Sequence, residues 1–200
     1  MIKFDLKVML LIVFLLGASS TAIAQNTDEL SIVRVDSTWG KEIIEFPIDW
    51  ASKLTIEGYE ELRFAPNWAD KTSEEFWTLV MSWNVKTETE LPLYELQFNF
   101  THYFDGLMKP NHWANEFPEP KVEFFEPETT ENGFIFKGKM FFFDGFHTGK
   151  LTTVYILGQQ EHCDTTGKSI IIFKISSKAY TERVWEKLNS INIKEDLCNF

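Results

Sequence analysis

The side chains best suited to chemistry in this sequence are four histidines, two cysteines and thirty acidic residues. His162, Cys163 and Asp164 are consecutive, and His147 lies one predicted turn earlier. A metal site needs three or four converging ligands, whereas consecutive residues of a strand point to opposite faces. We therefore predict no metal site and no cofactor, and we expect His147 and His162 to be turn histidines in solvent.

Nucleophilic and acid–base catalysis find equally little support. The chain has no Gly-x-Ser-x-Gly elbow, and cysteines that pair in an oxidising compartment are poor nucleophiles. A glycosidase needs two carboxylates about 5–10 Å apart across a cleft. Paired carboxylates do occur, at Glu60-Glu61, Glu74-Glu75 and Glu126-x-Glu128. So acidic a chain produces such pairs by chance, and we interpret them as solvated faces.

The two cysteines, Cys163 and Cys198, are expected to form a structural disulfide. Their number is even and their spacing is not Cys-x-x-Cys, which favours a bridge in an exported protein. Two free buried thiols are the alternative.

Two tryptophans stand in predicted loops among polar residues. Trp68 lies between Asn67 and Asp70, and Trp113 follows His112. Loop aromatics flanked by such residues can stack on a sugar ring or anchor a partner protein. Trp68, His112 and Trp113 are therefore our candidate binding residues, for a protein or carbohydrate ligand. Alternatively, each tryptophan folds back to cover the edge of the core.

The N-terminus has the features of a cleavable secretory signal. Lys3 and Lys7 precede an uninterrupted apolar run (Val8–Leu16), and small residues end at Ala24. Such a run is too short for a membrane anchor, which needs about 20 apolar residues. We predict a signal peptide at 1–24 and one exported domain at 25–200, periplasmic or extracellular, without a membrane span after cleavage.

The charge of the chain argues against two classes of partner. The formal net charge is −11, and removing the first 24 residues, which carry two lysines and one aspartate, leaves −12. An acidic domain repels phosphate backbones and anionic lipid. Nucleic acid and membrane surfaces are therefore not expected partners.

Several segments have the pattern of β-strands. Residues 76–85 alternate so that Trp77 and Trp83 share a buried face. Turn signals separate four later strands, at about 121–126, 133–143, 149–161 and 169–176. Met140–Phe143 and Ile170–Phe173 are apolar on both faces, which predicts central strands covered on both sides. Earlier strands are expected at 59–64 and, as one or two short strands, within 32–46.

Two segments have helical periodicity. In 92–107, Pro92 suits a first helical position and Gly106 a C-terminal stop, and apolar residues recur on one face: Leu93, Leu96, Phe100, Phe104 and Leu107. Alternation from Leu96 to Phe104 also fits a strand, but length and flanking signals favour the helix. A final helix is predicted at about 178–189, with Ser177 as its N-cap.

This order predicts an α+β fold, with a mostly antiparallel sheet of six to seven strands layered with two helices. In outline the chain resembles PsbP-like domains, on the residues Phe46-Pro47-x-x-Trp50, Leu62-x-Phe64-x-Pro66 and Ile171-Ile172-Phe173-x-Ile175-Ser176. The resemblance implies an antiparallel sheet layered with helices and a role in protein binding or assembly, and it transfers no catalytic residues. Altogether the sequence favours an exported, non-catalytic binding or accessory protein. A small secreted hydrolase using acidic residues and a structural envelope protein are the alternatives.

Overall fold

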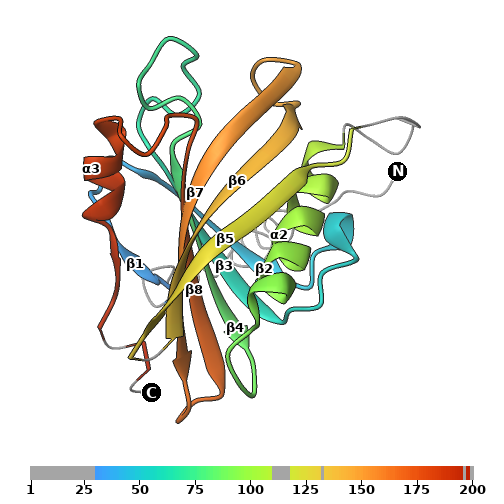
Figure 1. Cartoon of the computed structure of the whole chain (residues 1–200), viewed down its shortest axis with the longest axis vertical. Helices are drawn as coiled ribbons and strands as arrows, with labels where there is room; N and C mark the ends of the chain where they lie inside the picture. Colours follow the sequence, from blue (N-terminus) through green and yellow to red (C-terminus); the bar gives the residue numbers. More distant parts are fainter. Residues whose placement is uncertain (1–29, 110–117, 132, 196, 199–200) are drawn as a thin grey trace, which may run out of the picture.

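The protein is built around one seven-stranded antiparallel sheet (Figure 1). The structure, a computed structural model, describes residues 30–109, 118–131, 133–195 and 197–198. Across the sheet the strands follow the order β2 (Gly40–Phe46), β3 (Gly58–Phe64), β4 (Leu79–Lys86), β8 (Lys168–Ser176), β7 (Lys150–Cys163), β6 (Gly133–Asp144) and β5 (Lys121–Thr130). The predicted α+β class and antiparallel sheet are confirmed, although the protein is rich in strands.

Helices and short strands cover the two faces of this sheet. On one face lie α2 (Leu93–Met108) and the 3-10 turn η1 (Asp49–Ala51). On the other lie α3 (Val184–Asn189) and a two-stranded ribbon of β1 (Val33–Arg34) and β9 (Asn192–Ile193). Figure 1 shows α2 and α3 on opposite sides of the strands. The sheet is therefore the middle of three layers.

The central pair, β4 and β8, is buried on both faces. Phe173 packs against Phe100 of α2, with ring centroids 4.8 Å apart. On the other face, Val80 and Ile172 join the cluster that holds Trp185 of α3. The prediction of a doubly covered central strand is thus confirmed for β8.

For Met140–Phe143 the same prediction was wrong. This segment belongs to β6, the neighbour of the edge strand β5, and the side chain of Phe141 is 41% exposed on the outer face. An apolar side chain on the uncovered face of a sheet looks the same in sequence as one on a covered face.

The predicted helix at 92–107 is confirmed as α2, but the final helix is shorter than expected. Residues 178–183 form turns, and α3 begins at Val184. Ser177 donates its hydroxyl hydrogen bond to the Phe76 carbonyl instead of capping a helix. The Tyr180 hydroxyl donates to the Gly138 and Ile156 carbonyls of the sheet, and the Trp185 indole donates to the Lys178 carbonyl. These tertiary bonds hold the segment in turns.

The strand predicted from residue 76 begins at Leu79. Trp77 has a left-handed backbone (φ 52°), so it cannot continue the strand, yet its side chain is buried as expected. Trp83 is also fully buried in the core.

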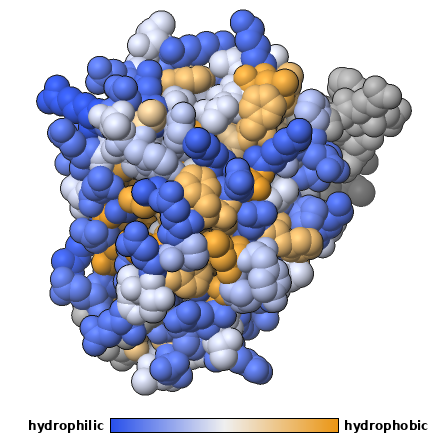
Figure 2. All heavy atoms as spheres, viewed as in Figure 1, coloured by the Kyte–Doolittle hydropathy of each residue, from blue (hydrophilic) through white to orange (hydrophobic). Residues whose placement is uncertain are grey.

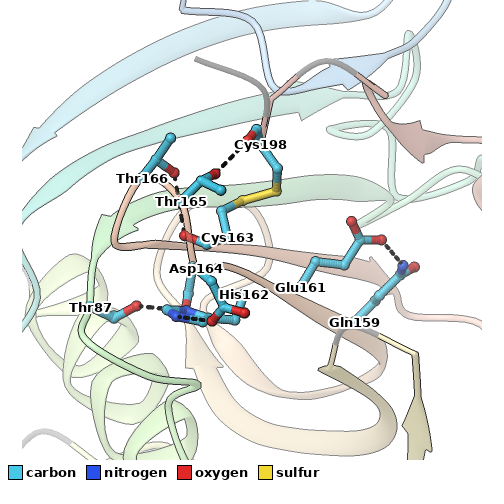
Figure 3. Close-up of a disulfide and its surroundings, with 10 residues drawn as sticks. Thr87, Gln159, Glu161, His162, Cys163, Asp164, Thr165, Thr166 and Cys198 are labelled. Atoms are coloured by element: carbon cyan, nitrogen blue, oxygen red, sulfur yellow. Dashed lines mark hydrogen bonds and ion pairs between the residues drawn. A yellow bond between two sulfur atoms is a disulfide. The ribbon is translucent and has the colours of Figure 1, made fainter.

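Cys163 and Cys198 form the predicted disulfide (Figure 3). It ties the C-terminal segment to the β7–β8 hairpin, where the Thr165 hydroxyl also donates to the Cys198 carbonyl at 3.0 Å. None of the helices in the described residues is long and apolar enough to span a membrane.

Removing this disulfide should destabilise the protein. The cysteines are 35 residues apart, and opening a loop of that length costs about 3–4 kcal/mol through the entropy of the unfolded chain. We expect the double variant Cys163→Ala/Cys198→Ala to lose that much free energy of unfolding in urea titrations. Reductant should destabilise the wild type and leave the variant unchanged. A double variant as stable as the wild type would contradict the prediction.

Candidate functional site

An apolar groove of about 560 Å³ lies between α2 and the strands β2, β3 and β4. Its lining side chains are mostly aromatic or aliphatic, with one acid, and come from distant parts of the chain: Glu42, Ile44, Trp50, Leu62, Phe64, Trp68, Trp77, Leu79, Met81, Tyr103, Phe104, Leu107, Phe146 and His147. Volume and composition are those of sites for small molecules, which measure about 300–1,000 Å³. We call it the apolar groove.

The β6–β7 hairpin supplies Phe146 and His147 to the groove. The buried Asp144 carboxylate accepts hydrogen bonds from the backbone N–H groups of Phe146, His147 and Thr148. Burial opposes ionisation of Asp144, but these hydrogen bonds outweigh burial and lower the pKa of the carboxyl. The carboxylate therefore fixes the turn and places both aromatic rings at the groove.

His147 is packed among aromatic rings rather than exposed, so the expectation of a solvated turn histidine was wrong. Its ring centroid lies 4.7 Å from that of Trp68 and 5.5 Å from that of Trp77. Its Nε2 atom is buried and has no hydrogen-bond partner among the described residues. Since an unsatisfied buried polar atom is costly, this nitrogen is suited to meet a polar group of a ligand.

Beneath the groove lies a fully buried carboxyl, Glu60 of β3. The Tyr103 hydroxyl lies 2.7 Å from its Oε2, and the Trp83 indole donates to its Oε1 at 3.1 Å. Burial raises the pKa of Glu60 to about 8, against the opposing effect of these bonds. The carboxyl is therefore mainly protonated at neutral pH. It does not line the groove itself, and it holds the Tyr103 ring in the groove wall.

A second, polar cavity of about 450 Å³ adjoins the groove. It is lined by residues 49–53, from η1 and the turn after it, and by His102, Asp105, Gly106 and Lys109 of α2. Trp50 lines both cavities and is 42% exposed. We call it the polar cavity.

Gly106 explains why η1 lies so close to α2. A Cβ at this position would lie 2.3 Å from the Trp50 carbonyl oxygen, closer than real Cβ contacts. Only glycine allows this approach, which places Trp50 at the boundary of the two cavities. Gly106 lies within α2, which ends at Met108, so the expectation that this glycine ends the helix was wrong.

Of the three predicted binding residues, only Trp68 lies within the described residues. Trp68 is half-buried in the groove wall, with its ring 4.6 Å from that of Phe64. It thus covers the edge of the core and lines a cavity at once. His112 and Trp113 lie outside the described residues, so their proximity to Trp68 stays a prediction. Trp50 and Phe146 were missed as lining residues, although each is an aromatic residue beside turn residues, and His147 was interpreted as a solvated turn histidine.

The carboxylate pairs do not form an acid–base site. Glu60 and Glu61 point to opposite faces of the sheet, and Glu126 forms an ion pair with Lys137. For Glu75, burial is outweighed by hydrogen bonds from Lys187 and Asn67, which lower the pKa of the carboxyl. A carboxyl that stays ionised in this way cannot act as a general acid at neutral pH.

His162 is also more buried than predicted, and its surroundings include an acid and a serine. Nε2 lies 3.3 Å from Asp164 Oδ1, and Nδ1 lies 3.2 Å from Ser169 Oγ. Figure 3 shows His162 directed toward Thr87 beside the disulfide. Because Ser169 is fully buried, no substrate can reach its hydroxyl, and we interpret the cluster as a support for the hairpin. No three His, Cys, Asp or Glu side chains of the described residues form a metal-binding group.

Apolar side chains are also exposed outside the groove. In the view of Figure 2 hydrophobic side chains are visible over the middle of the molecule and at its upper end, interleaved with hydrophilic ones. Phe141 and Leu151 belong to the outer face of β6 and β7, away from the groove. These scattered positions lack the concavity of the groove.

In comparisons with known proteins, the chain matches no family model, no curated protein and no solved structure. The PsbP-like resemblance therefore stays a prediction.

Proposed function

We propose that this protein is an exported, non-catalytic binding protein whose apolar groove holds a small, mainly apolar molecule. The observation that carries the proposal is the groove itself, an aromatic-lined concavity beside α2. Burying apolar ligand surface there would contribute roughly 25 cal/mol per Å². The unpartnered His147 Nε2 offers the ligand one hydrogen bond.

The disulfide supports the export part of the proposal, because such bridges persist in oxidising compartments. The geometry of the carboxylates favours binding over hydrolysis, since Glu42 is the one carboxylate among the described lining residues of the groove. A lone carboxylate does not supply the acid and base of a hydrolase.

A neutral apolar dye tests the proposal. N-phenyl-1-naphthylamine, which brightens in apolar surroundings, should bind the wild-type protein saturably. Phe146→Ala removes an aromatic ring from the groove rim and should weaken binding about tenfold, the loss expected for one well-packed aromatic contact. Fluorescence titration gives both dissociation constants.

Phe141→Ala is the matched control. Phe141 is 41% exposed and Phe146 51%, but Phe141 lies on the outer face of β6, away from the groove. We expect this variant to bind the dye as the wild type does. Leu107→Trp should block the groove and abolish binding. Equal weakening by both phenylalanine variants, or saturable binding that survives Leu107→Trp, would overturn the proposal.

A further inference from the structure

We infer that the apolar groove and the polar cavity form one site for an amphiphile, with an uncharged polyol head group in the polar cavity. The inference rests on the proposed function of the groove and adds the class of ligand. Trp50 is the structural link, because it belongs to the lining of both cavities. An apolar chain in the groove would therefore have its head beside the indole of Trp50.

The two cavities follow adjacent faces of the same helix. Tyr103 and Leu107 of α2 line the groove, whereas His102, Gly106 and Lys109 line the polar cavity. Since successive residues of a helix are rotated by 100°, the two sets lie side by side along α2. Trp50 lies where the two linings meet.

The polar cavity contains hydrogen-bonding atoms that the protein leaves unsatisfied. Asp105 is 6% exposed, and its Oδ2 accepts a hydrogen bond from Lys109 Nζ at 2.6 Å. Its Oδ1 is buried without a partner among the described residues, and so is Nδ1 of His102, one helical turn away. Buried polar atoms of this kind are normally paired, which points to a ligand that completes them.

The charges of the cavity favour an uncharged head. Asp49 and Asp105 are balanced by Lys53 and Lys109. Burial, and then the charge of Lys53, lower the pKa of His102, so its imidazole is neutral at pH 7. One hydroxyl of a polyol can donate to Asp105 Oδ1 while another donates to or accepts from His102 Nδ1. A head group with a net charge would find no excess of opposite charge in this cavity. A sugar ring would also stack on Trp50.

Four ligands with the same ten-carbon chain test the inference: decyl glucoside, 1-decanol, decanoate and decyltrimethylammonium, each below the concentration at which it self-associates. Isothermal titration calorimetry with the full-length protein should show the glucoside binding about tenfold more tightly than decanol, the gain of one or two hydrogen bonds to buried groups. Both charged ligands should bind more weakly than the glucoside.

Asp105→Asn should remove the preference for the glucoside and leave the affinity for decanol within about twofold, because the groove is untouched. Asp164→Asn is the matched control: it makes the same change at a fully exposed carboxylate on the β7–β8 hairpin and should keep the preference. If Asp105→Asn does not fold, as judged by circular dichroism, the ligand series on the wild type still decides.

The outcomes separate the inference from the function on which it rests. Equal affinity for glucoside and decanol, or tighter binding of either charged ligand, overturns the head-group inference and leaves the groove proposal standing. Failure of all four ligands to bind overturns the groove proposal as well.

Discussion

Raising the pH from 4 to 9 should lower the free energy of unfolding of the wild-type protein by about 4–5 kcal/mol through Glu60 alone. Burial raises the pKa of this carboxyl from an ordinary value near 4.5 to about 8. At about 1.4 kcal/mol for each pH unit between these values, the difference gives the expected loss.

The direction follows from proton binding. Below pH 4.5 the carboxyl is protonated in both the folded and the unfolded chain, so this stability is fully present. Between about pH 4.5 and 8 the unfolded chain loses the proton while the folded protein keeps it, so a rise in pH favours unfolding. Above pH 8 both states are ionised and the loss is complete.

Glu60→Gln isolates this effect. The amide resembles the protonated acid: its oxygen can accept from Trp83 and its nitrogen can donate to Tyr103. The variant should be close to the wild type in stability at pH 5 and several kcal/mol more stable at pH 9. Urea titrations at both pH values measure the difference. Parallel stability curves for the two proteins would show that Glu60 does not titrate in this range.

The same substitution at the neighbouring glutamate, Glu61, should destabilise the protein instead of stabilising it. Glu61→Gln should cost about 3–5 kcal/mol of stability at pH 7, the usual loss when one partner of a buried ion pair is removed. The Glu61 carboxylate accepts hydrogen bonds from the backbone N–H groups of Ile32 and Val33, and Arg63 lies 2.6 Å from its Oε1. Glutamine replaces one accepting oxygen by an NH₂ group, which cannot accept a hydrogen bond from the Ile32 and Val33 N–H groups or from Arg63.

Glu60→Gln at pH 7 is the matched control, because it makes the same chemical change one residue away on the opposite face. Hydrogen exchange adds a local measurement: in Glu61→Gln the amides of Ile32 and Val33 should lose protection, since the carboxylate is their partner. A Glu61→Gln protein with wild-type stability and unchanged protection at these amides would contradict the prediction.

Glu60 and Glu61 also show which features of the fold could be predicted from the sequence and which could not. Strong periodicity predicted the helix that became α2 and the four consecutive strands from β5 to β8, because local patterns record which face is buried. The pair Glu60-Glu61 was interpreted as a solvated face. Both are fully buried, and partners from other parts of the chain contact them: Trp83 and Tyr103 for Glu60, and Ile32 and Val33 for Glu61.

The candidate site was predictable only in part for the same reason. Trp68 could be selected as a loop aromatic, but nothing local shows that the hairpin with Phe146 and His147 folds against it. The length of the final helix was overestimated because Tyr180 and Trp185 fit one face of a helix in the sequence pattern. In the structure the Tyr180 hydroxyl bonds to a carbonyl of the sheet, and the Trp185 indole bonds to the Lys178 carbonyl. Hydrogen bonds of this kind cannot be recognised from the periodicity of the sequence.

The strand order has a consequence for how binding and folding are linked. The sheet consists of two meanders, β2–β3–β4 and β5–β6–β7–β8, in which neighbours in sequence pair locally, joined by a single seam between β4 and β8. That seam pairs Leu79 with Ile175, so it joins residues far apart in the sequence, and closing it costs more loop entropy than either meander. One wall of the groove comes from the first meander, and Phe146 and His147 come from the second. The groove is therefore complete only when the two halves are joined, and any ligand held there adds its binding free energy to their association.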